Sequence, residues 1–312
     1  MGYNKSNMIK KYVYKKLTWI DLESPTANDV RELMSEYDIH GLVAEELLIP
    51  TLKPKVDVYP NNIYLILHFP SLKKNKVGDS INQEIDFVIG KDFIITSHFD
   101  SIDPLLNFSK IFEVNSILDR SNIGNHAGFI FYYMIKSMYR QLLEELEYIR
   151  SGLTDAEQRI FHGEEKKMVF RISEINRDIL TFREAINVHR EVLNSFEIAG
   201  KQFFGDDFAY YLRDIVGEYY KVQNEVQNAK DFLQELRTTN DSLLTTKQNE
   251  VMKTFTVLAF IFLPMSFIGQ LFGMSIKYTP LQSDPNAFWE ILLIMVAAGV
   301  IIYGVFKHKR WL

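Results

Sequence analysis

The stretch Phe255-Thr-Val-Leu-Ala-Phe-Ile-Phe-Leu-Pro-Met-Ser-Phe-Ile-Gly-Gln-Leu-Phe272 carries no charge and is mostly apolar. A second apolar run, Ile291–Phe306, follows after a short polar loop. Each run is close to the ~20 residues that cross roughly 30 Å of hydrocarbon as a helix. A buried hairpin in a soluble protein is the alternative, but Trp289 at one edge and a basic cluster after the second run favour a membrane. The expected spans are about 252–272 and 287–306.

Basic residues indicate how these spans lie in the membrane, because cytoplasmic flanks carry an excess of Lys and Arg. The connecting loop has Lys277 as its one basic residue, opposed by Asp284. The outer ends of the two runs are flanked by Lys247, Lys253, Lys307, Lys309 and Arg310. We expect an integral protein of the cell (inner) membrane, with both termini in the cytoplasm and the loop outside.

Composition excludes several functions. The 312 residues contain no cysteine, which excludes disulfides, thiolate zinc sites, iron–sulfur clusters and cysteine nucleophiles. The net charge of -5, with no basic stripe, argues against nucleic acid as a partner. The seven histidines lack a His-x-x-x-His pair, and neither a phosphate-binding loop nor a Gly-x-Ser-x-Gly elbow is present. We therefore expect no enzyme and no organic cofactor.

Residues 1–124 are predicted to form a cytoplasmic α/β domain. Leu17–Leu22 and Asn62–Phe69 have the composition of strands, and Ser24-Pro-Thr-Ala-Asn-Asp is typical of a capped helix start. Ile85–Ile89 and Phe93–Ser97, separated by Gly-Lys-Asp, predict a hairpin. His68 and His98 fall on these strands, and we expect both to be structural.

Residues 125–250 are predicted to form long stalk helices, since no proline occurs between 105 and 263. One helix is expected from His126 to near Phe161, another from Glu164 to Phe196, and a third from Gly205-Asp-Asp into the membrane. A heptad seam follows the third helix. It either packs on this chain's own helices or builds a stalk of several chains. Its members are Leu212, Ile215, Tyr219, Val222, Val226, Ala229, Leu233, Leu236, Asn240 and Leu243.

The first predicted span also has a polar face, which a lipid-facing helix does not need. Hydroxyl and amide groups of this kind can line a water-filled pore, or they can join packed helices. The spacing alone leaves both explanations open. The residues on this face are Asn249, Met252, Thr256, Leu263, Ser266 and Gln270.

The sequence resembles the CorA family of magnesium and other divalent-cation transporters over nearly its whole length. The resemblance is carried by Asn249-Glu-Val-Met-Lys, by Phe262-Leu-Pro-Met-Ser-Phe-Ile before a Gly-Met pair, and by the closing Lys-His-Lys-Arg-Trp-Leu. Upstream, Trp19-Ile-Asp-Leu, Lys53-Pro-Lys-Val-Asp and Glu84-Ile-Asp-Phe-Val-Ile occur in the family's order.

This resemblance implies a funnel-shaped α+β homopentamer: the N-terminal α/β domain, the long stalk helices, and a transmembrane hairpin at 251–312 that surrounds one pore. By position, Asn249, Met252, Thr256 and Leu263 would line that pore. The resemblance also implies regulatory Mg²⁺ at subunit contacts. The residues concerned are Glu45, Glu46 and Asp214, for which a solvated helix face is the alternative.

The chain departs from the family pattern at the loop between the spans. Gly273-Met274-Ser275 stands where the family has Gly-Met-Asn. Ser has a shorter stem and no amide, and Lys277 would repel a cation, so we expect weaker capture of hydrated Mg²⁺. The expected function is a divalent-cation channel, with Mg²⁺ as the expected ion, driven by membrane potential and gated by intracellular divalent cations. The alternatives are transport of Zn²⁺, Co²⁺ or Ni²⁺, or a non-conducting, membrane-anchored metal sensor.

Overall fold

The computed structural model describes residues 8–51, 53–74, 80–99, 102–117, 124–274 and 286–309. It divides into two compact units, Met1–Arg237 and Thr238–Leu312. The predicted change at residue 124 from sheet to helices falls inside the first unit.

A six-stranded sheet organises the first unit, in the order β1-β2-β6-β5-β4-β3. β2 and β6 pair in parallel and all other neighbours are antiparallel, so the sheet is mixed. The predicted hairpin is confirmed, because β5 and β6 pair from Ile89↔Ile94 onward. The strands are β1 Met8–Tyr14, β2 Leu17–Glu23, β3 Lys55–Val58, β4 Ile63–Lys74, β5 Ser80–Ile89 and β6 Phe93–His98.

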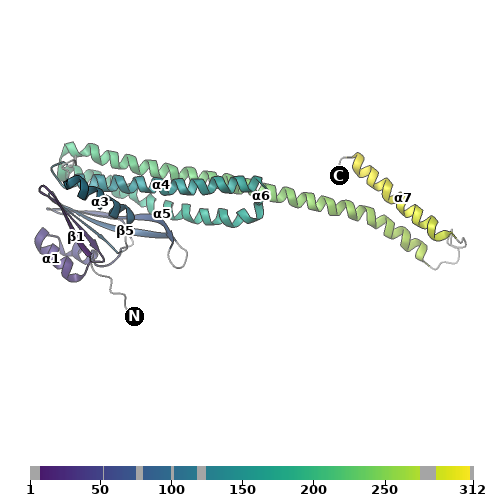
Figure 1. Ribbon diagram of the computed structural model, residues 1–312, viewed down its shortest axis with the longest axis horizontal. Coiled ribbons are helices and arrows are strands. Elements are labelled where there is room, and N and C mark those ends of the chain that lie inside the picture. The colour runs from purple at the N-terminus through teal and green to yellow at the C-terminus, as the bar shows by residue number, and fades with distance from the viewer. Residues whose placement is uncertain are drawn as a thin grey trace. The chain divides into compact units, whose positions relative to one another are not determined.

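Helices cover both faces of this sheet (Figure 1). One face packs with α1 (Ala27–Tyr37) and α2 (Gly41–Glu46) around a core that includes Tyr64 and Val88. The predicted cap of α1 is confirmed, because the Thr26 side chain accepts from the backbone of Asp29 in a capping box. The other face packs with α3 (Asp103–Ile117), α4 (Gly128–Phe161) and α5 (Glu165–Phe204), through ring pairs such as Phe87–Phe131 at 5.2 Å.

The second long helix was predicted to end at Phe196, and this end was wrong: α5 continues to Phe204. The continuation packs closely on the next helix, because a Cβ at Gly200 would meet Leu212 at 3.0 Å. α5 stops at Gly205, whose φ of 103° is one that other residues rarely adopt. A single turn, η1 (Asp206–Phe208), then leads into α6 (Ala209–Gly273).

The heptad seam of α6 lies inside a single chain. Every seam residue from Leu212 to Leu236 is at most 8% exposed, and Asn240 is 1% exposed. In the first unit α6 runs beside α4 and α5 (Figure 1). The explanation by packing on the chain's own helices is therefore confirmed.

A buried polar chain joins these helices to the sheet. The Tyr139 hydroxyl of α4 lies 2.9 Å from His189 Nδ1 of α5, and His189 Nε2 lies 2.9 Å from the backbone oxygen of His68 on β4. Because that oxygen can only accept, Nε2 carries the hydrogen and Nδ1 accepts from the tyrosine. Burial lowers the pKa of His189 to about 4, which keeps it neutral in this role.

The second unit contains the rest of α6 and α7 (Ala287–His308), which pack as an antiparallel pair. The Phe260 and Phe306 ring centroids are 5.9 Å apart, and Met265 Sδ lies 3.4 Å from the Cβ position at Gly299. Both helices are long and apolar enough to cross a membrane, and almost none of either apolar stretch is buried within the chain.

Candidate functional site

The polar face of α6 in the second unit is turned away from α7. Contacts with α7 come from residues such as Met265 and Gly269. At about 100° per residue, five of the six candidate residues lie on the side of the helix away from Met265 and Gly269, and Ser266 lies at the edge of that side. Phe260, one turn after Thr256, also contacts Phe306 of α7, so α7 borders this face. All six are exposed in the single chain, with Leu263 at 72% and Met252 at 59%. The set is Asn249, Met252, Thr256, Leu263, Ser266 and Gln270.

This exposed face carries hydroxyl and amide oxygen atoms. The Thr256 hydroxyl donates to the Met252 backbone oxygen at 2.8 Å, which leaves its lone pairs free to accept. Pro264 lies inside the helix and lacks an N–H, so the Phe260 carbonyl loses its usual helical partner. At the end of α6, Gly273 is the last helical residue and Met274 is 51% exposed. Ser275 and Lys277 lie outside the described residues.

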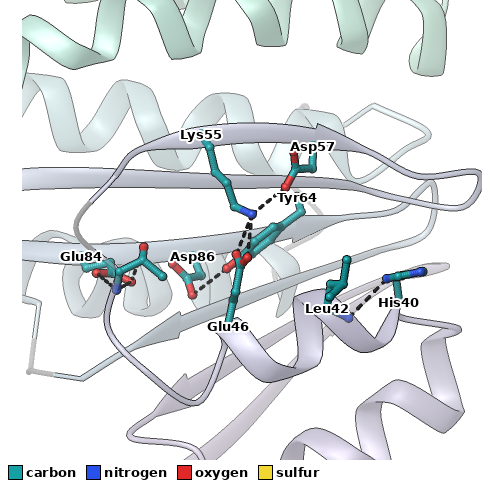
Figure 2. Close-up of polar contacts among 9 residues, drawn as sticks. His40, Leu42, Glu46, Lys55, Asp57, Tyr64, Glu84 and Asp86 are labelled. Atoms are coloured by element: carbon teal, nitrogen blue, oxygen red, sulfur yellow. Dashed lines mark hydrogen bonds and ion pairs between the residues drawn. The ribbon is translucent and has the colours of Figure 1, made fainter.

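Of the three predicted regulatory residues, two, Glu45 and Glu46, lie at the end of α2. Glu45 is exposed. Glu46 instead pairs with Lys55 of β3, whose Nζ lies 2.7 Å from Glu46 Oε2 and 2.7 Å from Asp57 Oδ2. Figure 2 shows this ammonium between the two carboxylates.

The third residue, Asp214 of α6, is engaged by α4. Its Oδ2 accepts from Lys136 Nζ at 2.6 Å and from the Tyr132 hydroxyl at 2.6 Å. The Lys136 ammonium holds the pKa of Asp214 below its usual range, and Asp214 in turn raises the pKa of Lys136. Both groups are therefore charged at neutral pH.

Carboxylates are suitable ligands for a divalent cation, but Glu46 and Asp214 already hold a lysine each. In the described ranges, no three acidic or histidine side chains are arranged to hold a metal ion. The sequence predicts a regulatory Mg²⁺ at subunit contacts, and within the single chain both carboxylates are paired with ammonium groups. The present arrangement therefore fits a resident ammonium better than a metal.

Sequence reasoning missed a buried acidic pair, Glu84 and Asp86, on one face of β5 (Figure 2). Glu84 accepts from the Thr51 backbone N–H at 2.8 Å and lies 3.2 Å from His68 Nε2. Asp86 is 1% exposed, and its Oδ2 accepts from the Tyr64 hydroxyl at 3.2 Å. Because β5 also carries Ser80, Asn82 and Gln83, no local pattern singles out these two carboxylates.

Asp86 holds a proton under ordinary conditions. Burial, followed by the neighbouring Glu84 carboxylate, raises the pKa of Asp86 to about 8. The Lys55 ammonium, which lies over the Tyr64 ring, is bound to Glu46 and Asp57. His68 and His98 lie on β4 and β6 as predicted, and each ring bonds to a carboxylate, Glu84 and Asp21 respectively.

A mixed-sheet domain, a helix that continues into a long apolar segment and a second apolar helix are together the architecture of a membrane-anchored protein. Residues 14–308 match the CorA family, described as "CorA-like Mg2+ transporter protein". The chain belongs to this family. It is thus a divalent metal ion transporter with C-terminal transmembrane helices, and not an enzyme.

Three comparisons describe its place in the family. It is 25% identical to the cobalt/magnesium transport protein CorA of Thermotoga maritima, over 95% of this chain and 83% of that one. It is 22% identical to the putative metal ion transporter YfjQ of Bacillus subtilis, over 94% and 89%. The complete structure of the CorA magnesium transporter from Methanocaldococcus jannaschii matches 96% of this chain and 94% of that one, with a TM-score of 0.82 and 18% identity. That structural match confirms the predicted fold.

The raised pKa of Asp86 predicts a pH dependence of stability. The folded chain keeps the proton up to about 8, whereas the ordinary value is 3.8, so unfolding between these values releases a proton. Stability therefore falls as pH rises, by roughly 2 kcal/mol from about pH 6 to about pH 8. Asp86→Asn should remove this slope in thermal unfolding of the detergent-solubilised full chain. An Asn variant with the same slope as the unmodified chain would contradict the assignment.

Proposed function

We propose that this transporter is a channel for divalent cations, with Mg²⁺ as its principal ion, lined by the exposed polar face of α6. The observation that carries the proposal is the position of that face. Its six residues are exposed in the single chain, and five of them lie on the side of α6 away from Met265 and Gly269, which contact α7. A polar face in an apolar segment is costly in lipid, but it is favourable around a water-filled path. Further copies of the chain would have to enclose that path.

The proposed assembly is a homopentamer in the cell (inner) membrane, with α6 around the pore and α7 outside it. The basic flanks favour both termini in the cytoplasm. On this arrangement Asn249 lies at the cytoplasmic entrance and Leu263 forms an apolar constriction within the membrane. A negative-inside potential favours entry of a divalent ion by about 4.6 kcal/mol at 100 mV, from roughly 2.3 kcal/mol per charge.

The proposed mouth is Gly273-Met274-Ser275. Five serines have shorter and less directed oxygens than five asparagines, so the capture of hydrated Mg²⁺ is weakened and Co²⁺, Ni²⁺ or Zn²⁺ can compete. The relative from Thermotoga maritima is named for both cobalt and magnesium, which is consistent with a divalent rather than a strictly Mg²⁺ pathway. The regulation by divalent cations that the sequence predicts at Glu45, Glu46 and Asp214 is not part of this proposal, because Glu46 and Asp214 each pair with a lysine.

The pore assignment is tested with two threonines of α6. Thr256 and Thr254 each donate to a backbone oxygen one turn earlier, at 2.8 Å and 3.0 Å, and both are exposed. They lie about 200° apart around the helix, so only Thr256 is on the polar face. Thr256→Val should reduce uptake of Mg²⁺ into liposomes several-fold under a negative-inside potential, because the pore loses an oxygen. Thr254→Val, the matched control, should leave uptake unchanged.

An equal loss of Mg²⁺ uptake in Thr256→Val and Thr254→Val would contradict the assignment of the polar face to the pore. Uptake at background by the unmodified chain, for Mg²⁺, Co²⁺, Ni²⁺ and Zn²⁺ alike, would favour the non-conducting metal sensor instead.

The mouth assignment has a separate test. Ser275→Asn restores a side-chain amide and carbonyl, and it should raise Mg²⁺ uptake at low external Mg²⁺ because first-shell waters are held better. The measurement is the concentration of Mg²⁺ that gives half-maximal flux in the same liposomes, with Ser173→Asn, at an exposed serine of α5, as the control. An unchanged half-maximal concentration for Ser275→Asn would contradict the assignment.

A further inference from the structure

Two carboxylates of α6, Asp214 and Glu218, lie one helical turn apart and face Lys136 of α4. The Lys136 ammonium is 2.6 Å from Asp214 Oδ2, 3.0 Å from the Tyr132 hydroxyl oxygen and 4.0 Å from Glu218 Oε1. This arrangement of oxygen ligands around one positive charge resembles a cation site. The positive charge at its centre is the side chain of Lys136, from the same protein chain.

The electrostatics of the cluster fit a fully charged occupant. Hydrogen bonds to Asp214 and then to Tyr132 raise the pKa of Lys136, and Lys136 lowers the pKa of Asp214. Glu218 is only 12% exposed at its side chain, and it has a second ammonium, Lys221, at 2.8 Å. The two carboxylates are therefore matched by two lysines.

The same arrangement occurs at the other predicted regulatory carboxylate. Lys55 lies 2.7 Å from both Glu46 and Asp57, and its ammonium stands over the Tyr64 ring at 5.2 Å from the centroid. Lys55 comes from β3 and Glu46 from α2, so this ion pair joins two elements, just as Lys136 joins α4 to α6. At both acidic sites, a lysine ammonium thus occupies the position between the oxygen atoms.

We propose that Lys136 and Lys55 are the resident cations of these two acidic sites, so that Asp214 and Glu46 do not bind a regulatory divalent ion in the native chain. The inference rests on the proposed function, because it concerns how that transporter is regulated. A divalent ion on Asp214 would be repelled by an ammonium only a few ångströms away. The divalent ion would also have to displace a lysine that belongs to the same chain and is therefore present at a high effective concentration. In binding, the ion would lose part of its tightly held water.

The test compares thermal unfolding of the full chain in detergent, in MgCl₂ and in KCl of equal ionic strength. The unmodified chain and Asp214→Asn should show the same Mg²⁺-dependent shift of the unfolding midpoint, because any Mg²⁺ that stabilises the chain binds at other sites. Lys136→Met should lower the midpoint by about 2–4 °C. It should then gain an additional, saturable rise in MgCl₂, because the oxygen site is now empty. The double variant Lys136→Met/Asp214→Asn should lose that gain.

Lys221→Met is the matched control, because it removes a lysine from the same cluster but leaves Lys136 in place. It should gain no Mg²⁺ response. The inference is overturned if Asp214→Asn abolishes a Mg²⁺ shift of the unmodified chain, or if Lys136→Met gains none. If Lys136→Met does not fold, the comparison of the unmodified chain with Asp214→Asn decides alone. Because unfolding requires no transport, these outcomes are independent of whether the liposome experiment finds flux.

Discussion

The packing of α6 along α4 and α5 is the interaction on which the rest of the structure depends. The same helix is buried on one side in the first unit and exposed through its apolar segment in the second. Its seam of Leu, Ile, Val and Tyr side chains contributes about 1.5–3 kcal/mol for each large apolar residue buried. This burial fixes which side of α6 faces α4 and α5 in the first unit.

Charge pairs also connect elements that pack through apolar side chains. Lys136 ties α4 to α6 through Asp214, and Lys55 ties β3 to α2 through Glu46. These pairs are partly exposed, so each contributes modestly to stability. Their larger effect is on chemistry, because a carboxylate that already holds an ammonium is a poor ligand for a divalent ion.

Local patterns in the sequence predicted most of the fold. The β5–β6 hairpin, the Thr26 cap and both apolar helices follow from turn residues, capping chemistry and hydropathy, which act over a few positions. The end of α5 was missed because it depends on contact between Gly200 and Leu212, which belong to different helices. The lysine partners of Glu46 and Asp214, and the buried Asp86, were also missed, since cross-element pairing and burial leave no local signal.

The central claim is that the polar face of α6 lines an aqueous path while the opposite face packs on α7. Because the chain has no cysteine, single cysteines report without background. They are placed at Thr256 and Ser266 on one face and at Ile261 and Met265 on the other, and liposomes are treated with a water-soluble thiol reagent. The account predicts fast modification at Thr256 and Ser266, slowed by Mg²⁺, and slow modification at Ile261 and Met265. Equal rates on both faces, or faster modification on the α7 side, would contradict it.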